Sequence, residues 1–338
     1  MKIVSFFNEK WEKEYLQSRL SEHPITFLEG TLQDHADLKD EDVEILSVFV
    51  KSTVDGEELD QFPNLKFITT RSTGFDHIDM KEAQGRGIVV SNVPTYGDNT
   101  VAEYAFALLL AVARNIYRSY HRVLEKGNFT TVGLRGFDLK GKTIGVVGTG
   151  NIGAHSIRIA NGFDMNIIAY DVKQNTNLQK EIDFEYVDFD DLLARSDIIT
   201  LHVPYNEHTH HMIGMDNISK IKKGAYLINT ARGSVVETRA LIKALESGIL
   251  AGAGLDVVEE EGYMRDDMEL IMEDHPNPES LRTLLANQYL IDHPGVLIVP
   301  HNAFNTNESI QRILDTTVEN IKAFVNGNPQ NVVSAKSQ

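Results

Sequence analysis

Residues Thr143–Gly153 have the sequence TIGVVGTGNIG. The apolar, β-branched run Ile144–Val147 predicts a buried strand, and the three glycines that follow predict a tight turn. A helix can begin directly after this turn, near Ala154. A strand, a GxGxxG turn and a helix in this order are typical of a βαβ unit in an open parallel sheet, so these residues predict a doubly wound α/β domain.

The same turn predicts a dinucleotide site. Glycines let the backbone approach a pyrophosphate, whose charge then lies on the amides at the start of the helix. The next predicted strand ends at Asp171, 18 residues after Gly153, about the spacing of an acid that binds a ribose 2′-hydroxyl. A carboxylate there would repel a 2′-phosphate, so Asp171 favours NAD; a structural glycine turn and an S-adenosylmethionine site are the alternatives. The expected cofactor-binding residues here are Gly148, Gly150, Asn151, Ile152, Gly153 and Asp171.

On both sides of this turn, short β-branched runs alternate with segments of helical length, a pattern that predicts parallel sheets covered by helices. The runs form two series, separated by a Pro/Gly break at Pro94–Asp98. The sequence therefore predicts an α/β protein with two doubly wound, Rossmann-like domains. The predicted strands are Lys2–Phe7, Ile25–Leu28, Glu44–Phe49, Lys66–Thr70 and Ile88–Val90, then Thr143–Val147, Asn166–Tyr170, Phe184–Val187, Asp197–Leu201, Ala225–Asn229, Gly252–Asp256 and Val296–Val299.

Two segments outside the strands predict long-range packing. Thr100–Arg118 opens with Thr100 and Glu103 at capping-box spacing and contains a run without polar residues, which predicts a helix buried at a domain or dimer interface. A last helix is expected at about Asn307–Val325; it is too small to form a domain and is expected to pack on the first series of strands. The long polar connection Glu259–Gly295 is expected to contain short helices of its own.

Composition excludes several classes of protein. The chain has 338 residues, 42% of them hydrophobic and 24% charged, which predicts about two globular domains. A net charge of −17 argues against binding to nucleic acid or an anionic membrane. There is no cysteine, so disulfides and cysteine-bound metals are excluded. The charges at Lys2 and Glu9 interrupt the apolar start too early for a signal peptide, so we expect a cytoplasmic protein.

Polar residues follow several predicted strands at the edge where a parallel sheet binds its ligands. Arg232 follows one strand, Asp256 ends another with Glu261 five residues later, and His301 follows the last. An arginine can hold a carboxylate and polarise a carbonyl, and a histidine beside a glutamate can supply a proton. These are the groups needed to reduce a 2-oxo acid beside a nicotinamide. Taken singly, each could be a surface ion pair, a solvated acid or a turn histidine.

Several motifs in order resemble the D-isomer-specific 2-hydroxyacid dehydrogenase family over nearly the whole chain. They are Arg71–Asp79, Asn92–Pro94, Val101–Glu103, the GxGxxG turn, Asn229–Gly233, Asp256 and Pro300–His301.

The resemblance implies a discontinuous substrate domain, residues 1–98 plus 304–338, and an NAD-binding domain, residues 99–303, with a cleft between them that closes on the substrate. It also implies catalysis by Arg232, Glu261 and His301, although Glu259 and Glu260 lie next to Glu261. A homodimer formed through the Thr100–Arg118 helix is a further implication. The remaining implied contacts are the amides of Thr73 and Gly74 for the substrate carboxylate, Asp256 for the nicotinamide carboxamide, and Val203, Pro204, Thr230 and Ala231 for the cofactor.

Within that family, some features are similar to D-lactate dehydrogenases. Phe304 resembles an aromatic residue that packs over a small substrate methyl, and Tyr96 occupies the position of an active-site tyrosine. Gly97 and Asn302 depart from the usual serine and apolar residue. We therefore predict NAD-dependent reduction of pyruvate to the D-2-hydroxy acid. The alternatives are hydroxypyruvate, a branched 2-oxo acid, phosphite, a different nicotinamide-dependent reaction, or an NAD-binding corepressor-like adaptor without turnover.

No metal site is predicted. His202, His208, His210 and His211 lie close in sequence after a strand, but a metal there would need convergent geometry and further ligands. The expected partners are a small 2-oxo or 2-hydroxy acid and a second copy of the chain.

Overall fold

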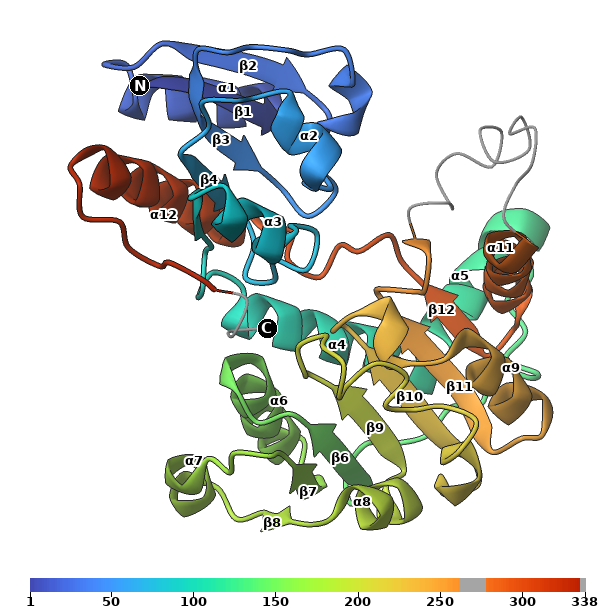
Figure 1. Ribbon diagram of the computed structural model, residues 1–338. Coiled ribbons are helices and arrows are strands. Elements are labelled where there is room, and N and C mark those ends of the chain that lie inside the picture. Colours follow the sequence, from blue (N-terminus) through green and yellow to red (C-terminus); the bar gives the residue numbers. More distant parts are fainter. Residues whose placement is uncertain (262–277, 335–338) are drawn as a thin grey trace. The chain divides into compact units, whose positions relative to one another are not determined.

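The computed structural model describes residues 1–261 and 278–334, and it divides into two compact units. Unit 1 comprises Met1–Tyr96 and Thr306–Gln338, and unit 2 comprises Gly97–Asn305. Each unit has its own sheet, and every strand pair in both sheets is parallel. The predicted α/β class with two parallel, helix-covered sheets is therefore confirmed (Figure 1).

The strands of unit 1 are β1 (Lys2–Phe7), β2 (Ile25–Glu29), β3 (Val43–Val48), β4 (Phe67–Thr70) and β5 (Val89–Ser91). They lie in the order β2-β1-β3-β4-β5, with β1 at the point where the order reverses. Strands β1, β3 and β4 are buried along nearly their whole length, as expected for parallel strands covered on both faces. The helices of this unit are α1 (Lys10–Arg19), α2 (Gly56–Asp60), α3 (Met80–Gly85), the short 3₁₀ turn Gln33–His35 and α12 (Asn307–Val325).

Helix α12 belongs to unit 1 although it comes from the end of the described chain. It packs against α1 and β4, and the ring of Phe324 stacks on that of Phe67 with centroids 4.4 Å apart (Figure 1). Leu314, Val318 and Ile321 join the same buried cluster. Each such side chain contributes about 1.5–3 kcal/mol when it leaves water, so α12 is a structural part of this sheet and not an appendage.

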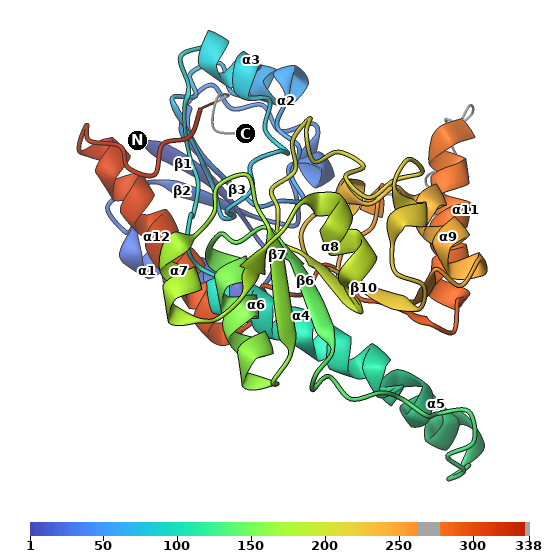
Figure 2. The ribbon, with the colours of Figure 1, turned by 90° about the horizontal axis from the view of Figure 1, so that it is seen from below.

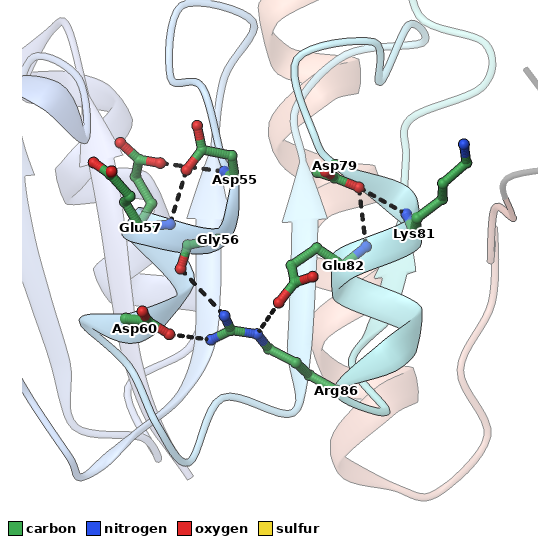
Figure 3. Close-up of polar contacts among 9 residues, drawn as sticks. Asp55, Gly56, Glu57, Asp60, Asp79, Lys81, Glu82 and Arg86 are labelled. Atoms are coloured by element: carbon green, nitrogen blue, oxygen red, sulfur yellow. Dashed lines mark hydrogen bonds and ion pairs between the residues drawn. The ribbon is translucent and has the colours of Figure 1, made fainter.

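Short helices α2 and α3 of unit 1 are fixed by their N-caps and by one arginine (Figure 3). The Asp55 carboxylate caps α2, and the Asp79 carboxylate accepts two amides at the start of α3. Arg86 donates to Glu82 on its own helix at 2.8 Å and pairs with Asp60 of α2 at 2.7 Å. These ion pairs are exposed, so the caps contribute more to the two helices than the charges do.

The strands of unit 2 are β6 (Thr143–Val147), β7 (Asn166–Tyr170), β8 (Glu185–Tyr186), β9 (Ile198–Leu201), β10 (Ala225–Asn229), β11 (Leu250–Leu255) and β12 (Val296–Ile298). They lie in the order β12-β11-β10-β9-β6-β7-β8, which reverses direction at β6. A reversal of this kind opens a crevice at the carboxyl ends of the strands, where ligands bind. The GxGxxG turn follows β6, so it lies at this point.

Helices cover both faces of the unit 2 sheet (Figures 1 and 2). On one face α4 and α6 contact each other and share a buried cluster, and α8, α9 and α11 contribute to a second cluster on the other face. The helices are α4 (Asp98–Ala113), α5 (Ile116–Lys126), α6 (Asn151–Gly162), α7 (Thr176–Glu181), α8 (Phe189–Arg195), α9 (Thr238–Glu246) and α11 (Pro278–Asp292), with 3₁₀ turns at Ile218–Lys220 and Gly233–Val235.

The predicted single helix Thr100–Arg118 is wrong at both ends. Helix α4 begins at Asp98 with Gly97 as its N-cap, and Thr100 is buried inside the helix, past the cap position. At the other end Asn115 adopts φ +52°, the left-handed conformation that asparagine tolerates better than most residues, and this breaks α4 from α5. Figure 2 shows α5 continuing from α4 beyond the sheet of unit 2.

The boundaries of the units fall after Tyr96 and after Asn305. In the polar connection Glu259–Gly295, the described part contains α11, and residues 262–277 lie outside the described residues. Within residues 1–261 and 278–334, no helix combines the length and apolarity needed to cross a bilayer.

Candidate active site

The glycine-rich turn after β6 has no room for a side chain at two positions. Gly148 has φ +92°, and a Cβ there would lie 2.6 Å from the carbonyl oxygen of His202. A Cβ at Gly153 would lie 1.9 Å from the carbonyl oxygen of Gly148. Gly150 instead faces open space and is the N-cap of α6, without a side chain that caps the helix. The turn is thus packed tightly on its inner side and open where α6 begins.

Asp171, at the end of β7, is joined to this turn by hydrogen bonds. One carboxylate oxygen accepts the amide of Thr149 at 2.5 Å and the Thr149 hydroxyl at 2.9 Å, and the other accepts the amide of Lys173. Tyr186 on β8 donates its hydroxyl to Thr149 Oγ1 at 2.9 Å. The acid predicted to bind the ribose therefore has a fixed position beside the turn. Thr149 and Tyr186 were not predicted, because Tyr186 lies 37 residues from Thr149 and no local pattern links them.

Behind the turn, His202 follows β9 and is held neutral by burial. Its Nε2 lies 2.9 Å from the hydroxyl of Ser156 on α6 and 3.0 Å from that of Thr200. Burial lowers the pKa of His202 to about 3 because the charged imidazolium would lose its hydration. The side chain therefore acts as a neutral hydrogen-bonding group between α6 and β9.

The residues at this edge fit a dinucleotide. The start of α6, at Asn151 and Ile152, offers amides that no side chain caps, next to open space at Gly150. Val203 packs beside Gly148, and Pro204 follows it. Across the switch point, Thr230 has a buried hydroxyl that forms no hydrogen bond to any described residue. The free amides at the start of α6 and the open space at Gly150 fit a pyrophosphate, and the unused hydroxyl of Thr230 can bind a further part of the cofactor.

The loop after β10 presents Arg232. The buried side chain of Asn229 closes this loop, because it accepts the amide of Ala231 at 3.0 Å and donates to the carbonyl of Arg232 at 2.9 Å. Gly233 lies against the neighbouring loop, where a Cβ would come within 2.0 Å of the Val258 carbonyl oxygen. The segment Asn229–Gly233 therefore holds Arg232 rigidly at the carboxyl end of the sheet, beside the loop that follows β11.

Asp256, directly after β11, is buried and binds the loop that carries His301. Its two carboxylate oxygens accept the amides of Asn302 at 2.7 Å and Ala303 at 3.1 Å. Burial raises the pKa of Asp256, and the two amides act in the opposite direction by stabilising the carboxylate. Asp256 thus fixes the backbone next to His301.

His301 pairs with one of three consecutive glutamates. Its Nδ1 lies 2.8 Å from Glu261 Oε1. Glu259 points elsewhere: its carboxylate contacts His211 at 2.6 Å and accepts the amide of Thr238 at 2.6 Å. Between them, Glu260 has φ +54°, which turns the chain. The geometry therefore separates Glu261 from its neighbour, which the spacing in the sequence could not do.

The backbone of His301 is itself unusual. Its φ is +49°, in the left-handed region that costs a non-glycine residue free energy and that is often found at functional sites. The Phe304 ring lies edge-on to the imidazole, with centroids 6.5 Å apart and planes at 80°. In unit 2, the neighbouring strands β10, β11 and β12 thus bring Arg232, Asp256, Glu261, His301 and Phe304 to one edge of the sheet.

The remaining predicted residues lie in unit 1. Thr73 and Gly74 follow β4, at the carboxyl edge of that sheet, and Thr73 is exposed. Tyr96 is the last residue of the first segment of unit 1, and its carbonyl accepts Arg312 Nε at 2.7 Å. These residues belong to a different unit from Arg232 and His301.

Comparisons with known proteins agree with this geometry. The sequence model described as "D-isomer specific 2-hydroxyacid dehydrogenase, NAD binding domain" matches residues 106–303. The chain is 37% identical to 2-hydroxyacid dehydrogenase A of Aspergillus oryzae, covering 96% of this chain and 92% of that protein. It is 40% identical to a glyoxylate reductase of Thermococcus litoralis, covering 87% and 84%.

A solved structure gives the same result for the fold. The D-lactate dehydrogenase of Aquifex aeolicus, solved in complex with NAD and lactic acid, superposes with a TM-score of 0.85 at 35% identity and 96% coverage of both chains. The GxGxxG turn, Asp171 and the family match all point to NAD as the cofactor. The chain therefore belongs to the D-isomer specific 2-hydroxyacid dehydrogenase family, as an NAD-dependent enzyme that reduces 2-oxo acids to D-2-hydroxy acids.

Proposed function

We propose that the enzyme reduces pyruvate to D-lactate. The observation that carries this choice is the position of Phe304, whose ring lies edge-on to the imidazole of His301. If the carbonyl of pyruvate lies within reach of His301, the methyl group on the carbonyl carbon lies near this ring. Moving that methyl group from water to the ring lowers the free energy. Glyoxylate has only hydrogen at that position.

His301 is the proposed proton donor. Its Nδ1 is occupied by Glu261, so Nε2 is the atom that gives a proton to the substrate carbonyl oxygen during reduction. The Glu261 carboxylate contacts Nδ1 and so fixes the orientation of the ring. Bound NADH supplies the hydride that adds to the substrate C2.

Arg232 is proposed to bind the substrate carboxylate and to polarise the carbonyl, because its planar guanidinium can donate two parallel hydrogen bonds. The backbone amides of Thr73 and Gly74 are proposed to bind the same carboxylate. Tyr96 is proposed to line the substrate position. Unit 1 would accordingly serve as the substrate domain and unit 2 as the NAD-binding domain.

For the cofactor, we propose that the α6 amides bind the pyrophosphate and that Asp171 binds the adenosine ribose. Asp256 and the loop residues Val203, Pro204, Thr230 and Ala231 are proposed to line the nicotinamide side.

We also propose a homodimer. Helix α5 exposes apolar side chains that a second copy could cover, among them Ile116, Tyr120 and Leu124, which are 54%, 61% and 63% exposed. Sedimentation would show a mass of about two chains if this proposal is right, and a monomer would refute it.

The first test is the rate of NADH oxidation with pyruvate, glyoxylate, hydroxypyruvate, phenylpyruvate, 2-oxobutyrate and 2-oxoisocaproate, followed by chiral analysis of the product. The proposal requires pyruvate to have the highest kcat/KM and D-lactate to be the product. L-lactate, or turnover of pyruvate well below the rest of the panel, would refute it.

Glyoxylate is the second candidate, because glyoxylate reductases are among the most similar relatives. The variant Phe304→Ala separates the two. If Phe304 packs on a methyl, the variant loses about tenfold or more in kcat/KM for pyruvate and much less for glyoxylate, since about 1.4 kcal/mol corresponds to a factor of ten. An equal loss for both substrates would mean that Phe304 does not pack on the methyl, and would remove the observation on which the choice of pyruvate rests.

A further inference from the structure

The loop Ser72–Gly74 in unit 1 has every acceptor of its backbone occupied. The Ser72 carbonyl accepts the amide of Val93 at 3.0 Å, and the Thr73 carbonyl accepts Asn92 Nδ2 at 2.7 Å. The Gly74 carbonyl accepts the hydroxyl of Ser72 at 2.6 Å. All three carbonyls are therefore turned to the protein side of the loop, which orients the peptide planes.

The donors of this loop face the other way. Among the described residues, the amides of Thr73 and Gly74 donate to no acceptor, although both residues reach solvent. Occupied carbonyls and two adjacent unused amides make the loop a donor pair for an anion. The positions of these two amides depend on whatever holds the carbonyls.

One support runs from the loop to α12. Asn92 donates to the Thr73 carbonyl, and Asn320 on α12 donates its Nδ2 to the Asn92 carbonyl at 2.9 Å. Asn331 in turn donates to Asn320 Oδ1 at 2.8 Å, and its carbonyl accepts the amide of Asn92 at 3.1 Å. Asn320 is fully buried and Asn92 is 7% exposed, so water does not replace these bonds readily. We call Asn92 and Asn320 the asparagine relay.

A second support lies on the other side of the loop and does not involve α12. The hydroxyl of Ser72 contacts that of Thr70 at 2.7 Å, and Thr70 Oγ1 contacts His77 Nε2 at 3.0 Å. This support fixes Ser72 and the Gly74 carbonyl. The Thr73 carbonyl, in contrast, accepts the side-chain amide of Asn92, so the orientation of the peptide between Thr73 and Gly74 depends on the relay.

We propose that the asparagine relay positions the Thr73 and Gly74 amides for the substrate carboxylate, so that Asn320 on α12 is a positioning residue for substrate binding. This inference rests on the proposed function of these two amides. Loss of the Asn320 donor leaves the Asn92 carbonyl buried without a partner, and the Asn92 side chain then no longer holds the Thr73 carbonyl in place. The amides rotate away from the carboxylate, while the NAD site in unit 2 is untouched.

The test compares Asn320→Leu, which has nearly the shape of asparagine but no polar atom, with Thr317→Val. Thr317 is also fully buried on α12, but the acceptor of its hydroxyl among the described residues lies within the helix, the Ile313 carbonyl at 2.8 Å. We expect Asn320→Leu to raise KM for the best 2-oxo acid at least tenfold and to leave KM for NADH within twofold. Thr317→Val should leave both values within twofold. A folded Asn320→Leu enzyme with unchanged KM for the 2-oxo acid overturns the proposal.

If Asn320→Leu does not fold, Asn92→Ala removes the next bond of the relay and carries the same expectation. Where both variants fold, their double mutant should raise KM by much less than the product of the two single effects, because both act through the Thr73 carbonyl. Multiplied effects would mean that Asn320 does not act through Asn92.

A spectroscopic readout separates this inference from the proposed function. In ¹⁵N-labelled protein, the amide resonances of Thr73 and Gly74 should shift in Asn320→Leu and not in Thr317→Val, whether or not any substrate is turned over. If these resonances stay in place, the relay is refuted. If they shift but the wild-type enzyme reduces no 2-oxo acid, the relay stands as a support of the loop and the proposed function fails.

Discussion

Glu261 Oε1 lies 2.8 Å from His301 Nδ1, although 40 residues separate them along the chain. The pair is partly open to solvent, with the glutamate side chain 43% exposed and the histidine 21%. The contact occupies one ring nitrogen of His301 and leaves the other for a substrate. The contact therefore orients the imidazole for catalysis more than it stabilises the fold.

We accordingly predict that Glu261→Gln lowers kcat by about 10²–10⁴-fold, the range that correctly placed acid–base groups contribute. Glu260→Gln should change kcat by less than twofold, because that side chain is exposed and turned away by a left-handed backbone. His301→Ala should lose at least as much activity as Glu261→Gln, with NADH affinity nearly unchanged in a fluorescence titration. Normal turnover by His301→Ala would disprove the assignment.

The cofactor preference tests Asp171. Asp171→Asn keeps an oxygen for the amide of Thr149 but removes the charge that would repel a 2′-phosphate. We expect the ratio of kcat/KM for NADH to that for NADPH to fall about tenfold or more in this variant. Asp171→Ser should lower the ratio too, and should also weaken NADH binding because Thr149 loses its acceptor. An unchanged ratio in both variants would mean that Asp171 only supports the turn.

Acid stability tests the buried state of His202. Its pKa is depressed to about 3 in the folded protein, from about 6.5 in an unfolded chain. Between these two pH values the unfolded state binds a proton at this histidine and the folded state does not. The resulting stability is fully present above pH 6.5 and is lost as the pH falls from 6.5 toward 3, by up to about 1.4 kcal/mol per pH unit. Urea unfolding at several pH values should show this extra slope in the wild type and not in His202→Gln. Equal slopes would contradict it.

A buried ion pair in unit 1 gives a prediction for stability. Arg71 donates to Glu12 on α1 at 2.9 Å and to the carbonyl of Phe6 at 2.6 Å, and both side chains of the pair are less than a tenth exposed. Glu12→Ala leaves a buried guanidinium without its partner and should cost about 3–5 kcal/mol of unfolding free energy. The double variant Glu12→Leu, Arg71→Met should recover much of that loss.

The exposed pair between Lys140 and Asp164 is the control for this measurement, and Lys140→Met should cost far less than Glu12→Ala. A Glu12→Ala loss no larger than that of Lys140→Met would show that the buried pair contributes little.

The strands were the part of the fold that the sequence predicted best. Three strands have the predicted bounds, namely Thr143–Val147, Asn166–Tyr170 and Ala225–Asn229. A parallel strand that is buried on both faces needs a mostly apolar run, and such a run can be recognised from the local sequence alone. Helix ends were less predictable. Thr100 looked like a cap from spacing alone, but tertiary packing buries it, and the left-handed turn at Asn115 leaves no periodic signal.

The residues of the site also fall into those that local sequence identifies and those that depend on distant contacts. The GxGxxG turn and Asp171 are close in sequence, and both could be identified from spacing. The distinction between Glu259 and Glu261 could not, because it depends on contacts with His211 and with Asn287, which donates to the Glu259 carbonyl from α11 at 2.9 Å. The asparagine relay likewise joins residues 228 positions apart, so no local pattern reveals it.

The discontinuous composition of unit 1 has a consequence during synthesis on the ribosome. Strands β1 to β5 are complete when Tyr96 has been added, but the helix that stacks Phe324 on Phe67 is made more than 200 residues later. At about 5–20 residues per second, roughly 10–50 s pass in which α1 alone covers this apolar face of the sheet, and the part around Phe67 that α12 later covers stays exposed. Unit 2 is contiguous and can fold within that interval, so unit 1 is completed after unit 2 although its strands are made before it, and chaperones have longer access to unit 1.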